Sequence, residues 1–212
     1  MQLTLQQVIP VPLKDRLQSR SSDIWMKDIS WNEGAHIFIQ APSGTGKTTL
    51  VHVLYRLRND HEGNVLWGNQ QLTDAETLAQ FRAQQVSIIF QDLRLFPDLT
   101  GWENLEVKRA LTNTVAANEV EDWMKRLGID HKKNSLGKTL SYGEQQRFAI
   151  VRALLQPFQW LLMDEPFSHL DKENTRKAAA LIHEVVLQRK ASFLMADLDE
   201  NDYFPYTQTY QL

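Results

Sequence analysis

The chain has 212 residues, 42% of them hydrophobic, with a formal net charge of −3 and no cysteine. This length and hydrophobic content suit one domain, or one core with an inserted lobe, and the lack of cysteine excludes a disulfide scaffold, a cysteine-ligated metal and a thiol nucleophile. The charge argues against nucleic acid as the main partner, and the absence of a long apolar run or a secretory signal predicts a soluble, intracellular protein.

The N-terminal part of the chain predicts short strands around a polar segment. Loose alternation over residues 3–8 indicates a strand that two prolines end, and residues 24–31 indicate a second strand. The polar residues 14–23 between them predict a loop. Residues 36–40 form a short apolar run bounded by turn residues, which is typical of a buried strand. A helix follows, because apolar residues recur at the helical period: Leu50, Val53, Leu54 and Leu57.

The rest of the chain predicts strands that alternate with helices. Three short apolar runs, at 87–90, 160–163 and 192–195, indicate buried strands, and residues 172–190 indicate a last long helix. A mainly helical stretch lies between the first two runs. Its two helical faces consist of Val120, Trp123, Met124 and Leu127, and of Phe148, Val151, Leu154 and Leu155. Strands that alternate with helices favour a parallel sheet.

A glycine-rich stretch follows the strand at 36–40. It consists of Ala41, Pro42, Ser43, Gly44, Thr45, Gly46, Lys47, Thr48 and Thr49. The stretch matches the phosphate-binding loop G-x-x-x-x-G-K-[ST], with Ala41 in the place of the first glycine. Its glycines let successive N–H groups point at phosphate oxygens, and the helix that follows adds the positive end of its dipole. Lys47 would bind the β- and γ-phosphates, and the Thr48 hydroxyl is placed to ligate Mg²⁺.

Two carboxylates, Asp164 and Glu165, end the apolar run at 160–163. The carboxyl ends of parallel strands are where ligands bind in such sheets. We therefore expect Asp164 to hold Mg²⁺ through a water opposite Thr48, and Glu165 to polarise the water that attacks the γ-phosphorus. Acidic residues after a strand are otherwise most often a helix cap or a solvated turn. The phosphate loop upstream favours the site.

Further segments of the chain carry a family resemblance. They are QDLRLFPDLT at 91–100 with Glu103-Asn104-Leu105, LSYGEQQR at 140–147 and SHLD at 168–171. With the phosphate loop and the acid pair they resemble the ATP-binding-cassette (ABC) ATPases, in the order Walker A, Q-loop, signature, Walker B and D-loop. The resemblance covers residues from about 24 to 200. The compact spacing and the phrase FQDLRLFPDLTGWENL look most like the small stand-alone cassettes of the lipoprotein-release, macrolide-efflux and cell-division type.

This resemblance implies an α/β fold of the P-loop NTPase class, built as an ABC-type cassette. A parallel-sheet core that binds ATP would comprise residues 1–91 and 157–212, with a small antiparallel β part near the N-terminus. Residues 92–156 would form a helical signature lobe. The resemblance also implies the ATP-binding and ATP-hydrolysing subunit of an ABC transporter, cytoplasmic and peripheral on the inner face of the cell membrane, beside a separate integral membrane permease.

The resemblance further assigns roles to individual residues. Gln91 would ligate Mg²⁺ and report on the membrane partner, so that Glu165, Lys47 and Gln91 carry catalysis. Ser141 and Gly143 would reach the γ-phosphate held by a second cassette. Two MgATP would then be buried head to tail in a homodimer or heterodimer, with Asp171 crossing the same interface. Ser141 and Glu144 also form a capping box, and we expect the capped helix end to face the phosphate.

The residues just after Gln91 allow two interpretations. Leu93, Leu95 and Phe96 would either line a groove for a cytoplasmic helix of the permease or pack within the helical lobe.

Three departures from the family pattern affect the site. Tyr142 stands where the signature usually has its first glycine, and Glu144 stands where glutamine is usual. Asp197 takes the place of the switch histidine, and a carboxylate there repels the γ-phosphate where an imidazole would donate a hydrogen bond. No aromatic residue between positions 8 and 22 is present to stack on adenine, and Trp25 is the nearest. His169 and His183 are expected in a loop and on a helix surface.

These departures leave more than one function open. Intact Lys47, Asp164 and Glu165 beside a lost histidine predict a protein that binds MgATP and dimerises but hydrolyses slowly. A low-turnover, ATP-dependent regulator of a membrane partner, as in cell-division cassettes, is the main alternative to a pump. A soluble cassette in DNA repair or translation is a further one, although the segment between Gln91 and Ser141 is too short for the long coiled coil that such proteins usually carry.

Overall fold

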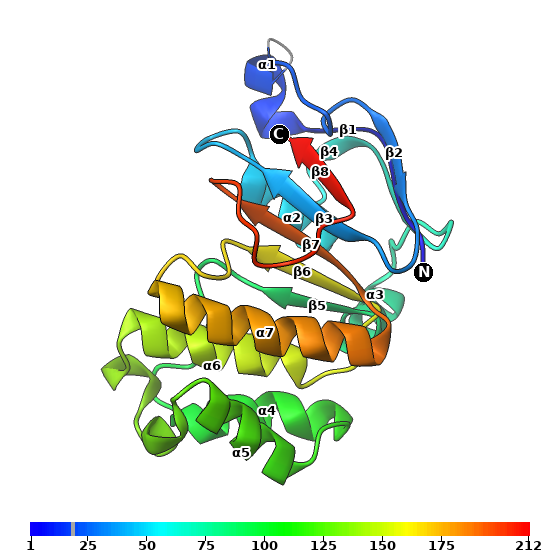
Figure 1. Ribbon diagram of the computed structural model, residues 1–212. Helices are drawn as coiled ribbons and strands as arrows, with labels where there is room; N and C mark the ends of the chain where they lie inside the picture. Colours follow the sequence, from blue (N-terminus) through cyan, green and yellow to red (C-terminus); the bar gives the residue numbers. More distant parts are fainter. Residues whose placement is uncertain (18–19) are drawn as a thin grey trace.

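The parallel sheet forms the centre of the molecule (Figure 1). A computed structural model describes residues 1–17 and 20–212. The sheet has the strand order β5-β6-β7-β3-β8, and every neighbouring pair is parallel. Its strands are β3 (His36–Gln40), β5 (Val86–Ile89), β6 (Trp160–Asp164), β7 (Ser192–Asp197) and β8 (Gln208–Gln211). Strands β3, β5, β6 and β7 consist mostly of buried residues, as expected for strands that helices cover on both faces.

A second, antiparallel sheet has the order β2-β1-β4. Its strands are β1 (Leu3–Pro10), β2 (Asp28–Trp31) and β4 (His61–Trp67). It lies beside the β3–β8 end of the parallel sheet (Figure 1). The predicted parallel core and small antiparallel part near the N-terminus are therefore confirmed.

The helices form layers on the two faces of the parallel sheet. They are α1 (Lys14–Leu17), α2 (Lys47–Leu54), α3 (Ala75–Gln84), α4 (Gly101–Thr112), α5 (Ala117–Arg126), α6 (Tyr142–Leu154) and α7 (Lys172–Arg189), with 3₁₀ turns at Val11–Leu13, Asp130–Lys132 and Gly137–Thr139. Helices α6 and α7 cover one face, and α4 and α5 lie outside α6 (Figure 1). The division into a core of residues 1–91 with 157–212 and a lobe of residues 92–156 stays a prediction.

The hydrophobic core divides at the parallel sheet. One cluster joins the outer helices to the sheet through residues such as Leu105, Phe148 and Ile182. The other joins α2 to the antiparallel sheet and includes Trp25, Trp31 and Trp160. Alternate residues of β6 point to opposite clusters, since Leu161 and Met163 belong to the first and Trp160 and Leu162 to the second. The sheet is therefore anchored on both faces.

Several predicted elements are confirmed within a few residues, and others need correction. The strands expected at 36–40, 87–90, 160–163 and 192–195 are β3, β5, β6 and β7. The expected loop at 14–23 instead begins with the helical turn α1, and residues 18–19 lie outside the described part of the chain.

The predicted strand at 24–31 is reduced to β2, because Ile24 and Trp25 are buried in the core without pairing to a neighbouring strand. Leu57 lies beyond the end of α2 and is 39% exposed, so it does not extend the apolar face of that helix. The apolar character of these side chains therefore does not place them in the predicted strand or helix.

The close approach of α4 to α6 predicts a steric requirement at Gly101. A Cβ added there would lie 2.4 Å from the Cζ atom of Phe148, which is fully buried on α6. Because overpacked cores lose stability, we expect Gly101→Val to lower the free energy of unfolding by about 1–3 kcal/mol. Urea denaturation monitored by circular dichroism measures this. Ala110→Val, at an exposed position of the same helix, should cost only a few tenths of a kcal/mol, and an equal loss in both variants would contradict the steric explanation.

Candidate functional site

The phosphate loop joins β3 to α2 at the carboxyl edge of the parallel sheet. Gly44 and Gly46 have φ values of 77° and 99°, in the left-handed region that only glycine adopts without strain. The Thr45 hydroxyl donates to the Pro42 carbonyl over 2.8 Å, and the Ala41 amide donates to the Asp197 carbonyl over 2.9 Å. These bonds tie the start of the loop to the end of β7 and stabilise the turn within it.

Two residues outside the loop contact it. Trp25 is 1% exposed, and its indole Nε1 donates to the Thr45 carbonyl over 3.1 Å. It supports the loop from within the core and cannot stack on a base. The guanidinium of Arg16, on α1, lies against Gly44, where an added Cβ would come within 2.8 Å of it. Neither contact could be predicted from the loop motif, because each depends on a chain segment outside it.

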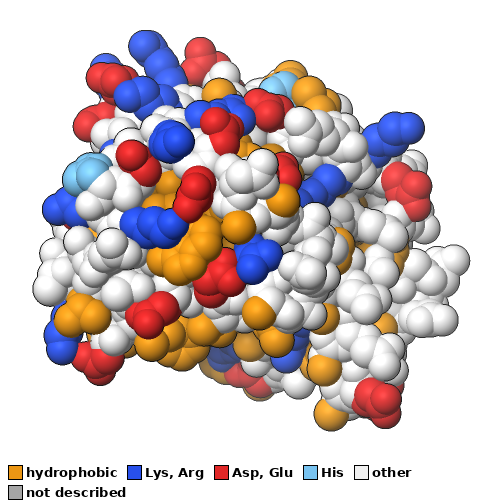
Figure 2. Space-filling model, turned by 90° about the horizontal axis from the view of Figure 1, so that it is seen from below, with side chains coloured by type: hydrophobic (Ala, Val, Ile, Leu, Met, Phe, Trp, Pro, Cys, Tyr) orange, Lys and Arg blue, Asp and Glu red, His pale blue; other side chains and the backbone are white. Residues whose placement is uncertain are grey.

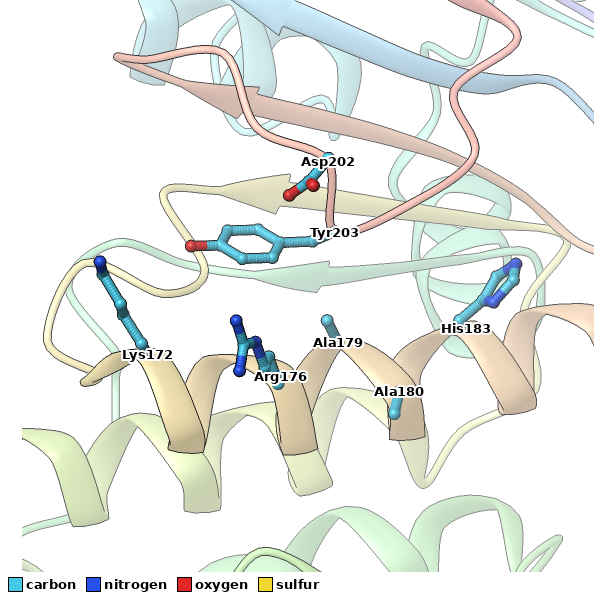
Figure 3. A pocket seen from close by; sticks show the side chains of 7 residues that line it. All are labelled: Lys172, Arg176, Ala179, Ala180, His183, Asp202 and Tyr203. Atoms are coloured by element: carbon cyan, nitrogen blue, oxygen red, sulfur yellow. The ribbon is translucent and has the colours of Figure 1, made fainter.

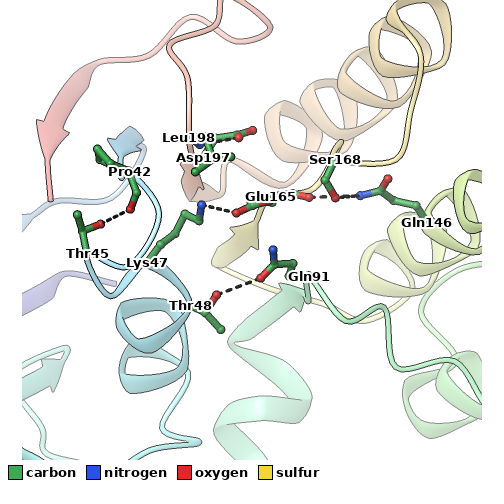
Figure 4. Close-up of polar contacts among 10 residues, drawn as sticks. All are labelled: Pro42, Thr45, Lys47, Thr48, Gln91, Gln146, Glu165, Ser168, Asp197 and Leu198. Atoms are coloured by element: carbon green, nitrogen blue, oxygen red, sulfur yellow. Dashed lines mark hydrogen bonds and ion pairs between the residues drawn. The ribbon is translucent and has the colours of Figure 1, made fainter. Parts of the chain in front are cut away.

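An ion pair links the loop to the end of β6. The Lys47 ammonium pairs with the Glu165 carboxylate, and both side chains are largely buried, at 8% and 12% exposure (Figure 4). Glu165 has a φ of 45°, which is unusual for a residue with a side chain. Its amide donates to the Ala196 carbonyl over 2.9 Å, so the neighbouring strand holds this backbone in place. The predicted lysine and glutamate thus lie together.

Asp164, Thr48 and Gln91 also meet at this edge. The Thr48 hydroxyl donates to Gln91 Oε1 over 3.2 Å (Figure 4). Asp164 is 1% exposed, and neither of its carboxylate oxygens accepts a hydrogen bond from a described residue. Burial raises the pKa of Asp164 to about 6, and the nearby Thr48 hydroxyl and Lys47 ammonium only partly oppose this.

These groups fit a magnesium ion. Mg²⁺ prefers oxygen ligands, keeps several waters and is usually bound through one or two protein groups beside substrate phosphates. A buried carboxylate without a hydrogen-bond partner, next to a hydroxyl and an amide oxygen, offers that set of donors and would gain from a cation.

Asp197 lies at the end of β7, between the two halves of the site. Its carbonyl accepts from the Ala41 amide, and its carboxylate accepts from the Leu198 amide over 2.7 Å. Burial raises the pKa of Asp197, the proximity of Glu165 raises it further, and Lys47 opposes the change. The position assigned to the switch histidine therefore holds a third carboxyl group near Asp164 and Glu165.

The signature residues lie at the N-terminus of α6. Ser141 caps this helix, and the reciprocal bonds between Ser141 and Glu144 confirm the predicted capping box. Tyr142 is 69% exposed, and its ring lies 5.2 Å from that of His169. His169 is in an exposed turn, as expected, whereas His183 is half-buried against His36 and Phe204 rather than on the helix surface.

A buried glutamine connects the signature helix to the acid pair. Gln146 Nε2 donates to the Glu165 carbonyl over 3.2 Å and to the Ser168 hydroxyl over 3.4 Å, and Gln146 Oε1 accepts from the His169 amide over 2.8 Å (Figure 4). The sequence analysis did not predict this role. The only sequence signal for this role was the helical position of Gln146 among apolar residues.

A cavity of about 410 Å³ shows which predicted residues come together. It is lined by Pro42, Ser43, Gly44, Gly46, Lys47, Thr48, Thr49, Gln91, Glu165 and Leu198. Ala41, Thr45 and Asp164 are buried and do not belong to this lining. Ser141 and Gly143 do not belong to this lining. The roles of all these residues in binding or catalysis stay predictions.

A larger cavity, of about 580 Å³, lies beside α7 (Figure 3). Its lining includes Lys172, Arg176 and His183 on α7, with Tyr203 and Asp202 above them. No residue of the phosphate loop lines it, and Asp202 offsets part of the positive charge. With Lys172 and Arg176 against Asp202, the lining carries a small excess of positive charge.

Comparisons with known proteins agree with this geometry. The family model described as ABC transporter matches residues 27–168. The chain is 32% identical over 173 residues to the aliphatic sulfonates import ATP-binding protein of Bacillus cereus, an alignment that covers 81% of this chain and 66% of that protein. It is 33% identical over 188 residues to a lipoprotein-releasing system ATP-binding protein of Chlorobium luteolum, covering 82% of this chain and 78% of that protein. The chain thus spans about two thirds of the length of the first relative.

Solved structures show the same fold. The dimeric structure of the bacterial ABC transporter cassette MJ0796 superposes with a TM-score of 0.79 at 24% identity, over 93% of this chain and 88% of that one. A dimeric post-hydrolysis state of MJ0796 bound to ADP and Pi superposes with a TM-score of 0.76. Within the described residues, none of the helices combines the length and hydropathy needed to cross a bilayer. The family model, the curated relatives and the fold together show that this chain belongs to the ABC transporter family as an ATP-binding cassette.

Proposed function

We propose that the chain is the ATP-hydrolysing subunit of an ABC transporter, closing head to tail around two MgATP to move a separate membrane protein. The observation that carries this proposal is the meeting of Lys47, Glu165 and the unpartnered Asp164 at the phosphate loop. An ammonium on the loop, a carboxylate beside it and a buried metal-binding carboxylate are the groups that phosphoryl transfer from a nucleotide requires.

In this proposal the loop residues from Ala41 to Thr49 bind the triphosphate. Thr48, Gln91 and Asp164 would hold Mg²⁺, which when bound neutralises charge on the β- and γ-phosphates. Glu165 accepts the proton of the attacking water as the oxygen–phosphorus bond between the β- and γ-phosphates breaks, giving ADP and phosphate. Lys47 must exchange its partner, since the ammonium that pairs with Glu165 is the group that binds the phosphates.

The signature residues act across a dimer interface in this proposal. Ser141 and Gly143 are absent from the lining of the phosphate-loop cavity. Ser141 is exposed at a helix N-terminus, which suits an anion supplied by a second copy or by a related cassette. Asp171 caps α7 through Asn174 and would lie in the same interface.

The names of the relatives support a proposal about the membrane partner and the location. The printed names of two relatives assign them to aliphatic sulfonates import and to a lipoprotein-releasing system. We propose the corresponding place for this chain, in the cytoplasm on the inner face of the membrane, bound to an integral membrane permease.

A second candidate function is a low-turnover, ATP-dependent regulator of a membrane partner. The observation in its favour is Asp197, whose carboxylate stands near Glu165 where a histidine would donate to the γ-phosphate. A negative charge there opposes the charge that develops on the transferred phosphoryl group. Slow hydrolysis with ATP-dependent dimerisation would favour this function over a pump.

Substitution of Glu165 tests the proposed hydrolysis. We expect Glu165→Gln to bind MgATP but to lower turnover by about 10²-fold or more, because the variant lacks the proton acceptor. It should accumulate as an ATP-dependent dimer in size-exclusion chromatography with light scattering. Lys47→Ala should lose MgATP binding in titration calorimetry, and Glu184→Gln, on the surface of α7, should match the wild type. MgATP binding unaffected by Lys47→Ala would refute the proposed site.

Substitution of Asp197 separates the two candidate functions. We expect Asp197→His to raise steady-state turnover about tenfold, because an imidazole removes the repulsion and can donate a hydrogen bond. Asp199→His, two residues along in an exposed position, serves as the control. If Asp197→His leaves turnover unchanged while Glu165→Gln abolishes it, Asp197 does not limit hydrolysis.

The raised pKa of Asp164 predicts a stability effect. A carboxyl group whose pKa is higher in the folded than in the unfolded protein costs stability once it is ionised in both states, and this cost disappears below the unfolded-state pKa of about 4. In EDTA at pH 8, Asp164→Asn should therefore be more stable than the wild type by about 1–3 kcal/mol, with the difference gone near pH 4. Thermal or urea unfolding at the two pH values measures it. Asp74→Asn, at a helix cap, should show no such gain.

A further inference from the structure

The cavity beside α7 is larger than the phosphate-loop cavity, and the proposed function leaves it without a role. We call it the α7 cavity. Its volume of about 580 Å³ lies within the range of roughly 300–1,000 Å³ that is usual for small-molecule sites. The residues of α7 that line it are spaced three or four apart and so share one face of the helix: Lys172, Arg176, Ala179, Ala180 and His183. Tyr203 and Asp202 close it from the opposite side (Figure 3).

The α7 cavity exists because the segment between β7 and β8 does not pack fully against α7. Residues 198–207 form no helix or strand. Phe204 anchors this segment, since its buried ring lies 4.9 Å from that of Phe193. The small side chains of Ala179 and Ala180 leave the neighbouring space open. The ring of Tyr203 is therefore 37% exposed at the cavity.

Two cations and one hydroxyl group meet at one end of the α7 cavity. The side chains of Lys172 and Arg176 rise from α7, one turn apart, and the Tyr203 hydroxyl points to the same end (Figure 3). Neither cation forms an ion pair with any residue that the structure describes, and the Tyr203 hydroxyl has no hydrogen-bond partner among those residues. The Tyr203 ring is held edge-on by Phe167, at 5.4 Å between centroids. These three donors suit an anion from outside the chain.

Cations on the opposite side of the molecule have partners within the chain. On the face that contains α4 and α5, basic and acidic side chains lie interspersed (Figure 2). Arg109 pairs there with Glu106 on the same helix. Lys133 pairs with Glu121. The face of α7 that lines the cavity differs from that surface, because it brings two like charges together without an acidic side chain in contact with either.

The rest of the α7 cavity offers hydrogen-bond acceptors rather than further cations. Asp202 belongs to the lining and forms no ion pair within the described part of the chain. His183 lies about 16 Å further along the helix than Lys172, and its Nε2 atom is buried without a hydrogen-bond partner among the described residues. A carboxylate and an imidazole nitrogen can both accept from hydroxyl groups. The cavity is therefore cationic at one end and suited to hydroxyl groups along its length.

We propose that the α7 cavity binds a small phosphate monoester with a hydroxylated body, the class that includes nucleoside monophosphates and sugar phosphates. The phosphate would lie between Lys172, Arg176 and the Tyr203 hydroxyl. The body would lie over Ala179 and Ala180 and donate hydrogen bonds to Asp202. This site shares no lining residue with the phosphate loop, so the inference goes beyond the proposed function.

A phosphate group fits these donors better than a carboxylate does. A phosphate monoester carries a charge of about −1.5 to −2 at pH 7 and has three acceptor oxygens. It can therefore accept from both cations on α7 and from the Tyr203 hydroxyl on the opposite side at once. A carboxylate carries one charge on two oxygens, so it would leave one of the two cations uncompensated.

The proposal is tested with two matched pairs of ligands. AMP is compared with adenosine, and glucose 6-phosphate is compared with glucuronate, which has a carboxylate where the phosphate ester stands. We expect at least one ester to bind the purified chain about tenfold more tightly than its matched analogue and than inorganic phosphate, with the difference falling at high salt. Titration calorimetry measures these affinities. If neither ester exceeds its analogue, or if inorganic phosphate binds as tightly as both esters, the proposal is wrong.

Variants of α7 test where the ester binds. Arg176→Gln and Lys172→Gln should each weaken it about tenfold, whereas Lys177→Gln, exposed on the same helix but outside the cavity lining, should leave its affinity unchanged. Ala180→Leu fills the cavity and keeps both cations, so it should abolish binding while circular dichroism shows an intact fold. Ester affinity that survives both Arg176→Gln and Ala180→Leu would overturn the proposal.

A variant of the phosphate loop separates this inference from the proposed function. Lys47→Ala should lose MgATP binding and keep the ester, because Lys47 does not line the α7 cavity. Loss of the ester in Lys47→Ala, with unchanged affinity in Arg176→Gln, would assign the ester to the phosphate loop and refute the inference. Absent ester binding beside intact MgATP binding and hydrolysis refutes the α7 cavity alone, whereas absent hydrolysis in the wild type refutes the proposed function.

Discussion

The site depends on the ion pair between Lys47 and Glu165, which joins the ends of two strands that are not neighbours. Strand β7 lies between β3 and β6, and its last residues accept hydrogen bonds from both sides, from the amides of Ala41 and Glu165. The ion pair closes this arrangement above the sheet edge. Because both charges are largely buried, removing either one would leave the other without compensation. In our proposal, an anion bound at the phosphate loop would compete with Glu165 for the ammonium, so that binding a triphosphate would also free the glutamate.

The parts of this site that could be predicted from the sequence are those that neighbouring residues determine. The phosphate loop, the acid pair and the capped helix at Ser141 each depend on a few consecutive residues, and buried parallel strands reveal themselves as short apolar runs. Strand β4 and helix α3 escaped prediction for the opposite reason. The first half of β4, His61 to Asn64, is mostly polar because it pairs at a solvent-facing part of the antiparallel sheet, and α3 buries only Phe81 fully. Neither has the regular apolar pattern on which such predictions depend.

Contacts between distant segments account for what sequence reasoning missed within the site. Trp25 was considered as a base-stacking residue, yet its indole lies under the phosphate loop and donates to the Thr45 carbonyl. Gln146 looked like one more residue of a capped helix, although its amide connects that helix to the Glu165 carbonyl and the Ser168 hydroxyl. A glutamine or tryptophan has the same local pattern whether its polar atom meets solvent or a backbone group far along the chain. For Gln146, only the packing of α6 against the acid pair distinguishes these two possibilities.

The same physical condition occurs at both ends of the segment that begins with Gln91. Among the described residues, the buried carboxylate of Asp164 on one side has no hydrogen-bond partner, and the half-buried Lys108 and Arg152 on the other form no ion pair. Packing alone does not require charged groups in these places, since apolar residues of similar size would be more stable there. In our proposal a cation bound at Asp164 would remove that cost there. Because the Leu93 and Arg94 carbonyls bind Arg152 while Gln91 contacts Thr48, the short segment that begins with Gln91 connects the two places.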